Sequence, residues 1–294
     1  MRSDRRITLD LEWLESRMLL SAPPLVTTFT SGGTTVSVYD TASSGKIVAS
    51  DIKVAFSADH AVDRLTLRGS DTLAGVGIVV SGAPGVDNIR DHRSGTRGDI
   101  GFIASDSSIK STDLKGNVAG FNLSGQTLGG VTFTDATTAP TGFYDTAGAH
   151  SIRVHGDLSG DVFLGGTGVT GDVLGRLRVS GGDLSGGVTV DGNAHKVKVR
   201  GGNFSGSLNV TGSLDRLVIA RNDAGTGGTL MAGADITISG MLDSGRISAY
   251  QTSNGSVAFG ITLATLDDRL KVGTHILHQG NLPFHDGDFG VVKA

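Results

Sequence analysis

The chain contains no cysteine, and this absence excludes disulfides, thiolate nucleophiles and cysteine-ligated metal sites. A chain of 294 residues does not need disulfides, because it can bury a sizeable hydrophobic core. No stretch approaches the ~18 consecutive apolar residues of a transmembrane helix, so we expect no membrane span. The net charge of -4 gives no general reason to expect nucleic acid as a partner.

Glutamate is almost absent, because Glu12 and Glu15 are the only two in the chain and aspartate is the only acid after them. Glutamate favours helices, whereas aspartate, asparagine, glycine, serine and threonine favour turns and strands. Glycine contributes 46 residues, which is roughly twice its usual ~7% share. Valine, isoleucine and leucine are plentiful, so the composition is not that of a disordered chain. The composition therefore predicts a folded, all-β body.

Residues 1–22 have a composition of their own and read MRSDRRITLDLEWLESRMLLSA. Three arginines at the start and a small-residue end fit the outline of a signal peptide, but the apolar core of about 7–15 residues is missing. Leu11, Leu14 and Met18 instead fall on one face of a helix. Composition alone predicts an amphipathic helix for this segment.

Residues 14–22, which read LESRMLLSA, resemble the LEPR-XLL motif found near the N-terminus of large exported proteins of planctomycetes and related bacteria. The family has proline where this chain has Ser16, while the leucine, the glutamate, the arginine and the Leu-Leu pair match. The resemblance covers this short segment only. It implies an export or sorting address, an extracellular or cell-surface location and a repetitive surface protein behind the motif, and it implies no activity.

The body of the chain repeats itself. SIRVHGDLSGDVFLGG from residue 151, RLRVSGGDLSGGVTVDG from 176 and KVKVRGGNFSGSLNVTG from 196 align, and a looser copy begins at 216. Each unit alternates apolar and polar residues, which is typical of a strand, and continues into a Gly-Gly-Asp/Asn turn where glycine allows positive φ. Val179, Val199 and Ile219 are equally spaced. Weaker echoes lie upstream: DRLTLRG at 63 matches DRLVIAR at 215, and GFNLSG at 120 matches GNFSG at 202.

A unit of about 20 residues without a helix cannot bury its apolar face alone, but stacked units can. We therefore expect a parallel β-helix, a solenoid of about 20 residues per coil in which strands pair between successive coils. We expect it to be right-handed, the commoner choice for coils longer than strict hexapeptide units. A β-sandwich needs no such repeat, and the ~40–45-residue blades of a propeller carry aromatic signatures that are absent here.

An open-ended solenoid exposes unpaired strand edges at both ends, which need caps and also permit end-to-end self-association. Residues 256–294 abandon the repeat and contain Phe284 and Phe289, which are larger than most coil residues. We therefore divide the chain into a targeting segment (1–22), an N-terminal cap or linker (23–56), the β-helix (57–255) and a C-terminal cap (256–294).

Outward residues of stacked coils form columns, and several of these residues are basic. Arg176, Lys196 and Arg216 are equally spaced and should share one column, with Arg153, Arg178 and Lys198 in the next. Such a strip suits an anionic polymer such as an acidic polysaccharide. The alternative is a solvated sheet face that lysine and arginine protect from edge pairing.

No group of residues in the sequence predicts a metal or cofactor site. The turn residues Asp157, Asp183 and Asn203 could offer oxygens to calcium, but turn capping explains them better, because calcium needs several converging carboxylates. The sequence GGTGVTGD at residue 165 has threonine where a calcium-binding nonapeptide repeat needs aspartate. The group His275, His278, His285, Asp286 and Asp288 has spacing that is poor for shared ligation on a strand.

Many β-helices act on polysaccharides, so an enzyme is the main alternative. Glycoside hydrolysis needs two carboxylates across a cleft, yet Asp267 and Asp268 are the only adjacent acids and should face opposite ways on a strand. The body has no tryptophan with which to stack on a sugar. We predict a non-catalytic exported or cell-surface protein of the structural or adhesion type. The alternatives are a lyase, hydrolase or binder acting on an acidic polysaccharide, and a self-assembling filament former.

Overall fold

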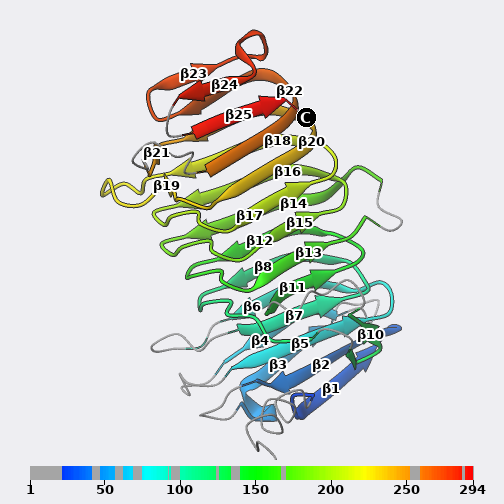
Figure 1. The fold of residues 1–294 in the computed structure, drawn as a ribbon. Helices are drawn as coiled ribbons and strands as arrows, with labels where there is room; N and C mark the ends of the chain where they lie inside the picture. The colour runs from blue at the N-terminus through cyan, green and yellow to red at the C-terminus, as the bar shows by residue number, and fades with distance from the viewer. Residues whose placement is uncertain are drawn as a thin grey trace, which may run out of the picture.

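A computed structural model describes residues 22–41, 47–56, 62–68, 75–91, 93, 100–123, 126–133, 140–166, 170–251, 259–286 and 289–293. These residues form 25 β-strands and two 3-10 helices of three residues each, so the predicted all-β body is confirmed. The strands are stacked from one end of the molecule to the other largely in chain order, although β10 (Val131–Thr132) lies beside β2 (Thr34–Asp40) and β5 (Val76–Ser81) at the N-terminal end (Figure 1). Apart from Ala22, the targeting segment and the LEPR-XLL residues lie outside the described part of the chain.

One mixed sheet contains 21 of the strands, and much of it is built from two parallel ladders in which most strands pair with the strand two places further along the chain. The first ladder runs through β4 (Val62–Leu67), β6 (Val86–Asp91), β8 (Ile109–Leu114), β12 (Ala149–Val154), β14 (Asp172–Ser180), β16 (Asn193–Arg200) and β18 (Leu214–Ala220). The second runs through β5 (Val76–Ser81), β7 (Ile100–Ser105), β11 (Thr141–Asp145), β13 (Asp161–Leu164), β15 (Val188–Val190) and β17 (Ser207–Val210). Both continue into the longer strands β20 (Asp235–Ile247) and β22 (Phe259–Val272).

The register of these ladders stacks like residues on like. Val179 pairs with Val199, and Val199 pairs with Ile219, so the predicted interior file is confirmed. All three side chains are fully buried. The match between the copies at residues 63 and 215 is also confirmed. Leu65 and Leu217 occupy the same position in the two copies, and the register partners of successive strands in the first ladder connect one to the other.

The spacing between stacked residues departs in several places from the expected value of about 20 residues per coil. The step from one partner to the next is constant from β14 to β18, but it is longer from β12 to β14 and from β18 to β20. It is longest between β8 and β12, where Thr112 pairs with Ile152. Turns of different length absorb the difference, and the paired strands stay in register.

The long step between β8 and β12 contains an insertion that covers the outside of the sheet. It includes the hairpin of β9 (Thr127–Leu128) and β10 (Val131–Thr132). Phe133 of this segment lies 5.0 Å from the ring of Tyr144, which in turn stacks on Phe163 at 5.3 Å. A second hydrophobic cluster therefore forms on the outer face of the sheet, and all residues of β11 are buried.

The corners between the two ladders are made by a short Gly-Asp/Asn-x-Ser-Gly motif. Leu158, Leu184, Phe204 and Leu230 bridge from coil to coil at this corner. The next residue in this column upstream is Val118, so the equivalent copy is GNVAG at 116 and the predicted echo at residue 120 is wrong. The true copy has alanine in place of serine, which hides it from a search for the Ser-Gly ending.

Different strands close the two ends of the stack. At the N-terminal end, β1 (Leu25–Ser31) and β2 (Thr34–Asp40) pair antiparallel, and β3 (Ile52–Phe56) follows the 3-10 helix η1 (Ala49–Asp51) and pairs antiparallel with β4. At the C-terminal end, β23 (His275–Leu277) and β24 (Phe284–Asp286) pair antiparallel with β22 and β25 (Phe289–Lys293), and η2 (Gln279–Asn281) lies between them. The remaining strands, β19 (Thr229–Leu230) and β21 (Ala249–Tyr250), pair with each other.

Residues 256–294 do not abandon the stack as a whole, in contrast to the expectation. Strand β22 pairs in parallel with β20 along both halves of its length, and β25 extends the second ladder by one more strand. The reason is visible in the sequence: Arg-Leu-Lys-Val at 269–272 repeats Arg-Leu-Arg-Val at 176–179.

Asp145 is one of two buried carboxylates among the described residues, the other being Asp91. Asp145 is fully buried in register with Ser105 and Leu164. Its Oδ1 accepts a hydrogen bond from the backbone N–H of Ala147 at 2.9 Å, and its Oδ2 has no partner among the described residues. Burial raises the pKa of Asp145 well above its usual range, and the nearby Asp106 carboxylate raises it further.

We expect Asp145→Asn to raise the melting temperature at neutral pH. An acid with a raised folded-state pKa stabilises the fold fully below its unfolded pKa of about 3.9, and that stability is lost as the pH rises through the folded pKa. Asparagine has no such titration, so thermal unfolding from acidic to neutral pH should show the wild type losing its advantage and the variant overtaking it.

Asp91→Asn is the matched control, because Asp91 is also buried but lies 2.9 Å from the buried guanidinium of Arg93. Removing that charge takes a carboxylate away from the buried guanidinium of Arg93 and should lower the melting temperature. The same shift at every pH for Asp145→Asn would contradict the raised pKa of the buried carboxyl.

Candidate functional site

The basic residues singled out from the sequence lie on the outer face of the first ladder. In β16, Val197 and Val199 are buried in the core. Because side chains alternate across a strand, Lys196, Lys198 and Arg200 project to the opposite, outer face. The same alternation places Arg176 and Arg178 outward in β14.

The register brings all six predicted residues together in two adjacent columns. Arg176 pairs with Lys196, and Lys196 pairs with Arg216. In the second column, Arg153 pairs with Arg178 and Arg178 pairs with Lys198. We call this surface the basic strip, and the name includes the four further cations described in the next paragraph.

Three further cations extend the strip toward the C-terminal end, and a fourth, Arg200, lies beside its columns. Arg216 pairs with Ser244 and Ser244 with Arg269, while Val218 leads to Arg246 and Arg246 to Lys271. Arg200 flanks both columns on β16. Sequence reasoning missed Arg269 and Lys271 because it assigned their segment to a cap, although the Arg-Leu-Lys-Val repeat marks them. The complete strip consists of Arg153, Arg176, Arg178, Lys196, Lys198, Arg200, Arg216, Arg246, Arg269 and Lys271.

The cations of the strip lie close enough to oppose one another's charge. Partial burial lowers the pKa of Lys196, and Arg216, Arg176 and Arg178 lower it further. Partial burial likewise lowers the pKa of Lys198, with added contributions from Arg178 and Arg200. An anion placed over the strip would relieve this repulsion, because an opposite charge favours the charged form of a lysine.

Few carboxylates neutralise the strip among the described residues. Arg200 pairs with the exposed Asp223, and Arg269 lies 3.9 Å from Asp268. Arg178 donates a hydrogen bond to the hydroxyl of Ser180 at 2.8 Å. No ion pair to a described residue is found for the other cations of the strip, which are Arg153, Arg176, Lys196, Lys198, Arg216, Arg246 and Lys271.

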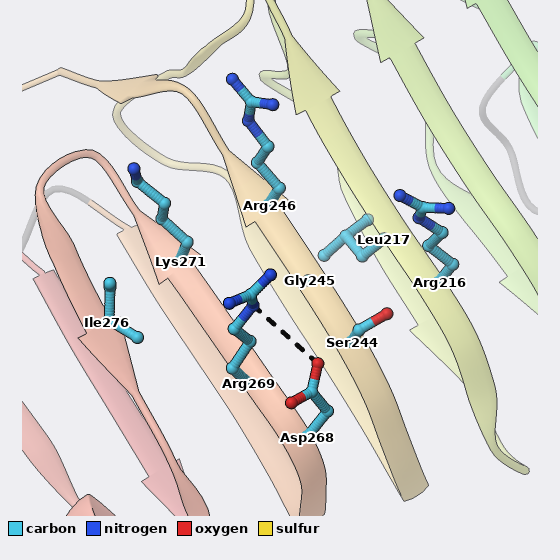
Figure 2. Close-up of a pocket in the computed structure, with 9 residues that line it drawn as sticks. All are labelled: Arg216, Leu217, Ser244, Gly245, Arg246, Asp268, Arg269, Lys271 and Ile276. Atoms are coloured by element: carbon cyan, nitrogen blue, oxygen red, sulfur yellow. Dashed lines mark ion pairs between the residues drawn. The ribbon is translucent and has the colours of Figure 1, made fainter.

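Two adjacent hollows interrupt the strip at its C-terminal end. The first has a volume of about 500 Å³ and the second of about 670 Å³. They share Arg216, Arg246 and Lys271, so they form one continuous depression. Figure 2 shows the first hollow, in which the side chains rise from three neighbouring strands and from Ile276 of β23.

Acidic residues follow one border of the strip. Asp215, Asp243 and Asp268 directly precede Arg216, Ser244 and Arg269, which are successive register partners. His195 lies on the same border, and its Nδ1 is 2.7 Å from Oδ2 of Asp215. The strip therefore has a carboxylate border on one side.

The turn residues considered for calcium instead link the coils. Oδ1 of Asp157 accepts the backbone N–H of Asp183 at 2.8 Å, and Oδ1 of Asp183 accepts the N–H of Asn203 at 2.6 Å. The preferred interpretation is correct in that backbone N–H groups of the turns donate to these oxygens, but the bonds run to the next coil and not within one turn. Within the ranges given above, no group of three histidine or acidic side chains could hold a metal ion.

The histidines near the C-terminus have separate environments. The ring of His275 lies 5.5 Å from that of Phe284, and Nδ1 of His278 lies 2.9 Å from the backbone carbonyl oxygen of Asp268. Asp288 lies outside the described residues, and nothing is described for the side chain of Asp286. The structure therefore brings no shared ligand set together from the described members of this group.

Comparisons add no assignment. No protein-family model matches the sequence, and neither does any curated protein or solved structure. In the part of the chain that the structure describes, no helix is long and apolar enough to cross a membrane. The function must therefore be argued from the basic strip.

Proposed function

We propose that this protein is a non-catalytic, exported parallel β-helix of the cell surface whose basic strip binds a linear anionic polysaccharide. The observation that carries the proposal is the continuous register of outward cations over β12 to β22. The LEPR-XLL resemblance of residues 14–22 supports export. The two parallel ladders, joined at a shared corner column, support the β-helix.

The dimensions of the strip suit an extended polymer. Six successive strands at ~4.8 Å spacing give a strip of about 24 Å. A compact ligand would meet only one or two cations on such a surface, whereas a chain lying along the stack meets one or two at nearly every strand. Linear polyanions gain affinity from this kind of repeated contact.

A polysaccharide fits the strip better than nucleic acid does. Proteins that bind single strands without sequence preference stack the bases on aromatic side chains, and none of the residues lining the two hollows is aromatic. The proposed contact is therefore electrostatic and confined to the strip.

The residues that line the hollows also fit binding better than hydrolysis. Hydrolysis of a glycosidic bond needs two carboxyl groups roughly 5–9.5 Å apart across the substrate. Asp268 is the only carboxylate among the residues lining the two hollows. We therefore favour binding over hydrolysis at this site.

The double variant Lys196→Ala/Arg216→Ala tests the proposal. Each exposed cation contributes up to ~1 kcal/mol to an ionic contact, so losing two should weaken binding about tenfold. Isothermal titration with dextran sulfate and with polygalacturonate would measure this loss. Binding by the wild type should also weaken as salt is added, because salt screens exposed charges.

Lys53→Ala/Lys110→Ala is the matched control. It removes the same charge from β3 and β8, and both lysines are exposed. Its affinity should stay within about twofold of the wild type. Equal weakening by the two double variants would mean that net charge, and not the strip, governs binding. Failure of the wild type to bind either polymer would exclude the proposed function.

A further inference from the structure

The first hollow differs from the rest of the strip because its chemistry is mixed. Arg246 and Lys271 lie on one side of Arg269, and Asp268 and Ser244 lie on the other (Figure 2). Along the rest of the strip the outward residues are cations or uncharged residues, and the border acids Asp215 and Asp243 line neither hollow. A ligand in the first hollow therefore meets positive charge at one end and a carboxylate and a hydroxyl at the other.

The carboxylate of Asp268 is available to a ligand. Its Oδ2 is 3.9 Å from Nε of Arg269, which is too long for a hydrogen bond. The contact with His278 uses the backbone carbonyl oxygen of Asp268 and leaves the carboxylate untouched. The side chain is 60% exposed. Asp268 can therefore accept hydrogen bonds from hydroxyl groups of a bound molecule.

Ser244 and Ile276 complete the hollow. The Ser244 hydroxyl has one long contact, at 3.5 Å, with the backbone carbonyl oxygen of Asp215, so it can turn toward a ligand. Ile276 follows Lys271 in the register and is 52% exposed, which places an apolar side chain at the end of the strip. Sugar residues present both hydroxyl groups and apolar C–H faces, so both residues have a counterpart on a sugar.

We propose that this hollow is a subsite for one acidic sugar residue that carries a carboxylate together with free ring hydroxyls, that is, a uronate. The carboxylate lies against Arg246 and Lys271, and Asp268 accepts hydrogen bonds from the hydroxyls. This inference rests on the proposed function and gives the polysaccharide its class. Asp268 determines the selectivity, because it accepts hydrogen bonds from hydroxyl groups and repels polyanions that have no hydroxyl groups.

The test compares two polymers on the same variant. Polygalacturonate carries carboxylates and free hydroxyls, whereas inorganic polyphosphate carries charge without hydroxyls along its chain. Asp268→Ala should weaken polygalacturonate binding about threefold, through the lost hydrogen bonds, and strengthen polyphosphate binding about threefold, through the lost repulsion. Titration calorimetry of both polymers at one salt concentration measures the two changes.

The opposite signs separate selectivity from simple charge. Asp235→Ala is the control, because Asp235 is exposed at the start of β20 and pairs with Ser207 of the second ladder, away from the strip. It should leave both affinities within about 1.5-fold. Asp268→Ala strengthening both polymers, or leaving polygalacturonate unchanged, would overturn the subsite while leaving the proposed function standing. A wild type that binds neither polymer would overturn both.

Discussion

Replacing Phe204 with alanine is expected to lower the free energy of unfolding by about 3–5 kcal/mol, the range for truncating a buried phenylalanine. Phe204 is fully buried and bridges Leu184 on one side and Leu230 on the other. Its backbone is held between the same coils, because its N–H donates to the carbonyl of Thr229 at 2.9 Å. The cavity would open at the corner where the two ladders meet, and neighbouring coils cannot collapse into it without breaking register.

Urea-induced unfolding followed by circular dichroism measures the loss. Phe204→Leu is the matched control, because the residues above and below it in the column are already leucines. A swap that keeps an apolar side chain of similar volume should cost less than about 1.5 kcal/mol. If the alanine and leucine variants lost equally little stability, Phe204 would not be a core residue of a stacked corner.

Replacing Gly202 with alanine is expected to cost about 3 kcal/mol, at the upper end for overpacking. A Cβ at this position would overlap the carbonyl oxygen and carbon of Gly182 in the neighbouring coil. Backbone atoms cannot rotate away as a flexible side chain can. The same conflict recurs along the column, because a Cβ on Gly182 would overlap the backbone of Gly156. Glycine is needed here because the coils approach closely.

Gly181→Ala is the informative comparison, measured by the same unfolding experiment. Gly181 has φ of +77° and no atom within 4 Å of an added Cβ. Its cost is the backbone strain of a left-handed residue, about 1–2 kcal/mol. The two positions of the Gly-Gly pair thus require glycine for different physical reasons. The sequence-based interpretation, that glycine is needed for a positive φ, holds only for the first position. A cost at Gly202 no greater than at Gly181 would contradict close stacking.

The repeat predicts the stacking of coils well where the turns have constant length. In a parallel ladder every residue of one strand has one partner in the next, so equal spacing in the sequence becomes a column in space. Val179, Val199 and Ile219 follow this rule, as do the three cations of the first column. The prediction needed only period-two alternation and a constant step between copies.

Insertions in turns limit what the repeat can predict. A longer turn changes the residue count without changing the register, so β8 and β12 stay partners across the segment inserted between them. The outer hydrophobic cluster was not predicted, because the aromatic rings of Phe133 and Tyr144 meet through tertiary packing of an insertion that has no repeat of its own. Val218 occupies one position of a column whose neighbouring members, Lys198 and Arg246, are cations. An outward position in the stack therefore does not determine which type of residue occupies it.

The sequence predicts that the strip exists, but its full extent could be determined only from the structure. The six predicted residues are brought together, and Arg200, Arg246, Arg269 and Lys271 join them. The hollows could not be predicted, because they depend on how side chains of successive strands, and Ile276 of β23 in the first hollow, come together in space. The proposed role of Asp268 came only from its place beside this depression.

A disulfide test addresses the central claim, that the equally spaced cations of the repeat form one column. The natural chain has no cysteine, so only introduced thiols can react. Lys196→Cys/Arg216→Cys places two thiols on register partners, whose Cα atoms, ~4.8 Å apart, lie within disulfide range. Lys196→Cys/Val218→Cys shifts one thiol two positions along its strand, to a separation of about 8 Å, beyond that range.

Copper-catalysed oxidation followed by titration of free thiols is the measurement. The account predicts that the first pair loses its free thiols within one molecule and that the second pair keeps them. Oxidation of the second pair in preference to the first would show a different register, and the basic strip would not exist as a column.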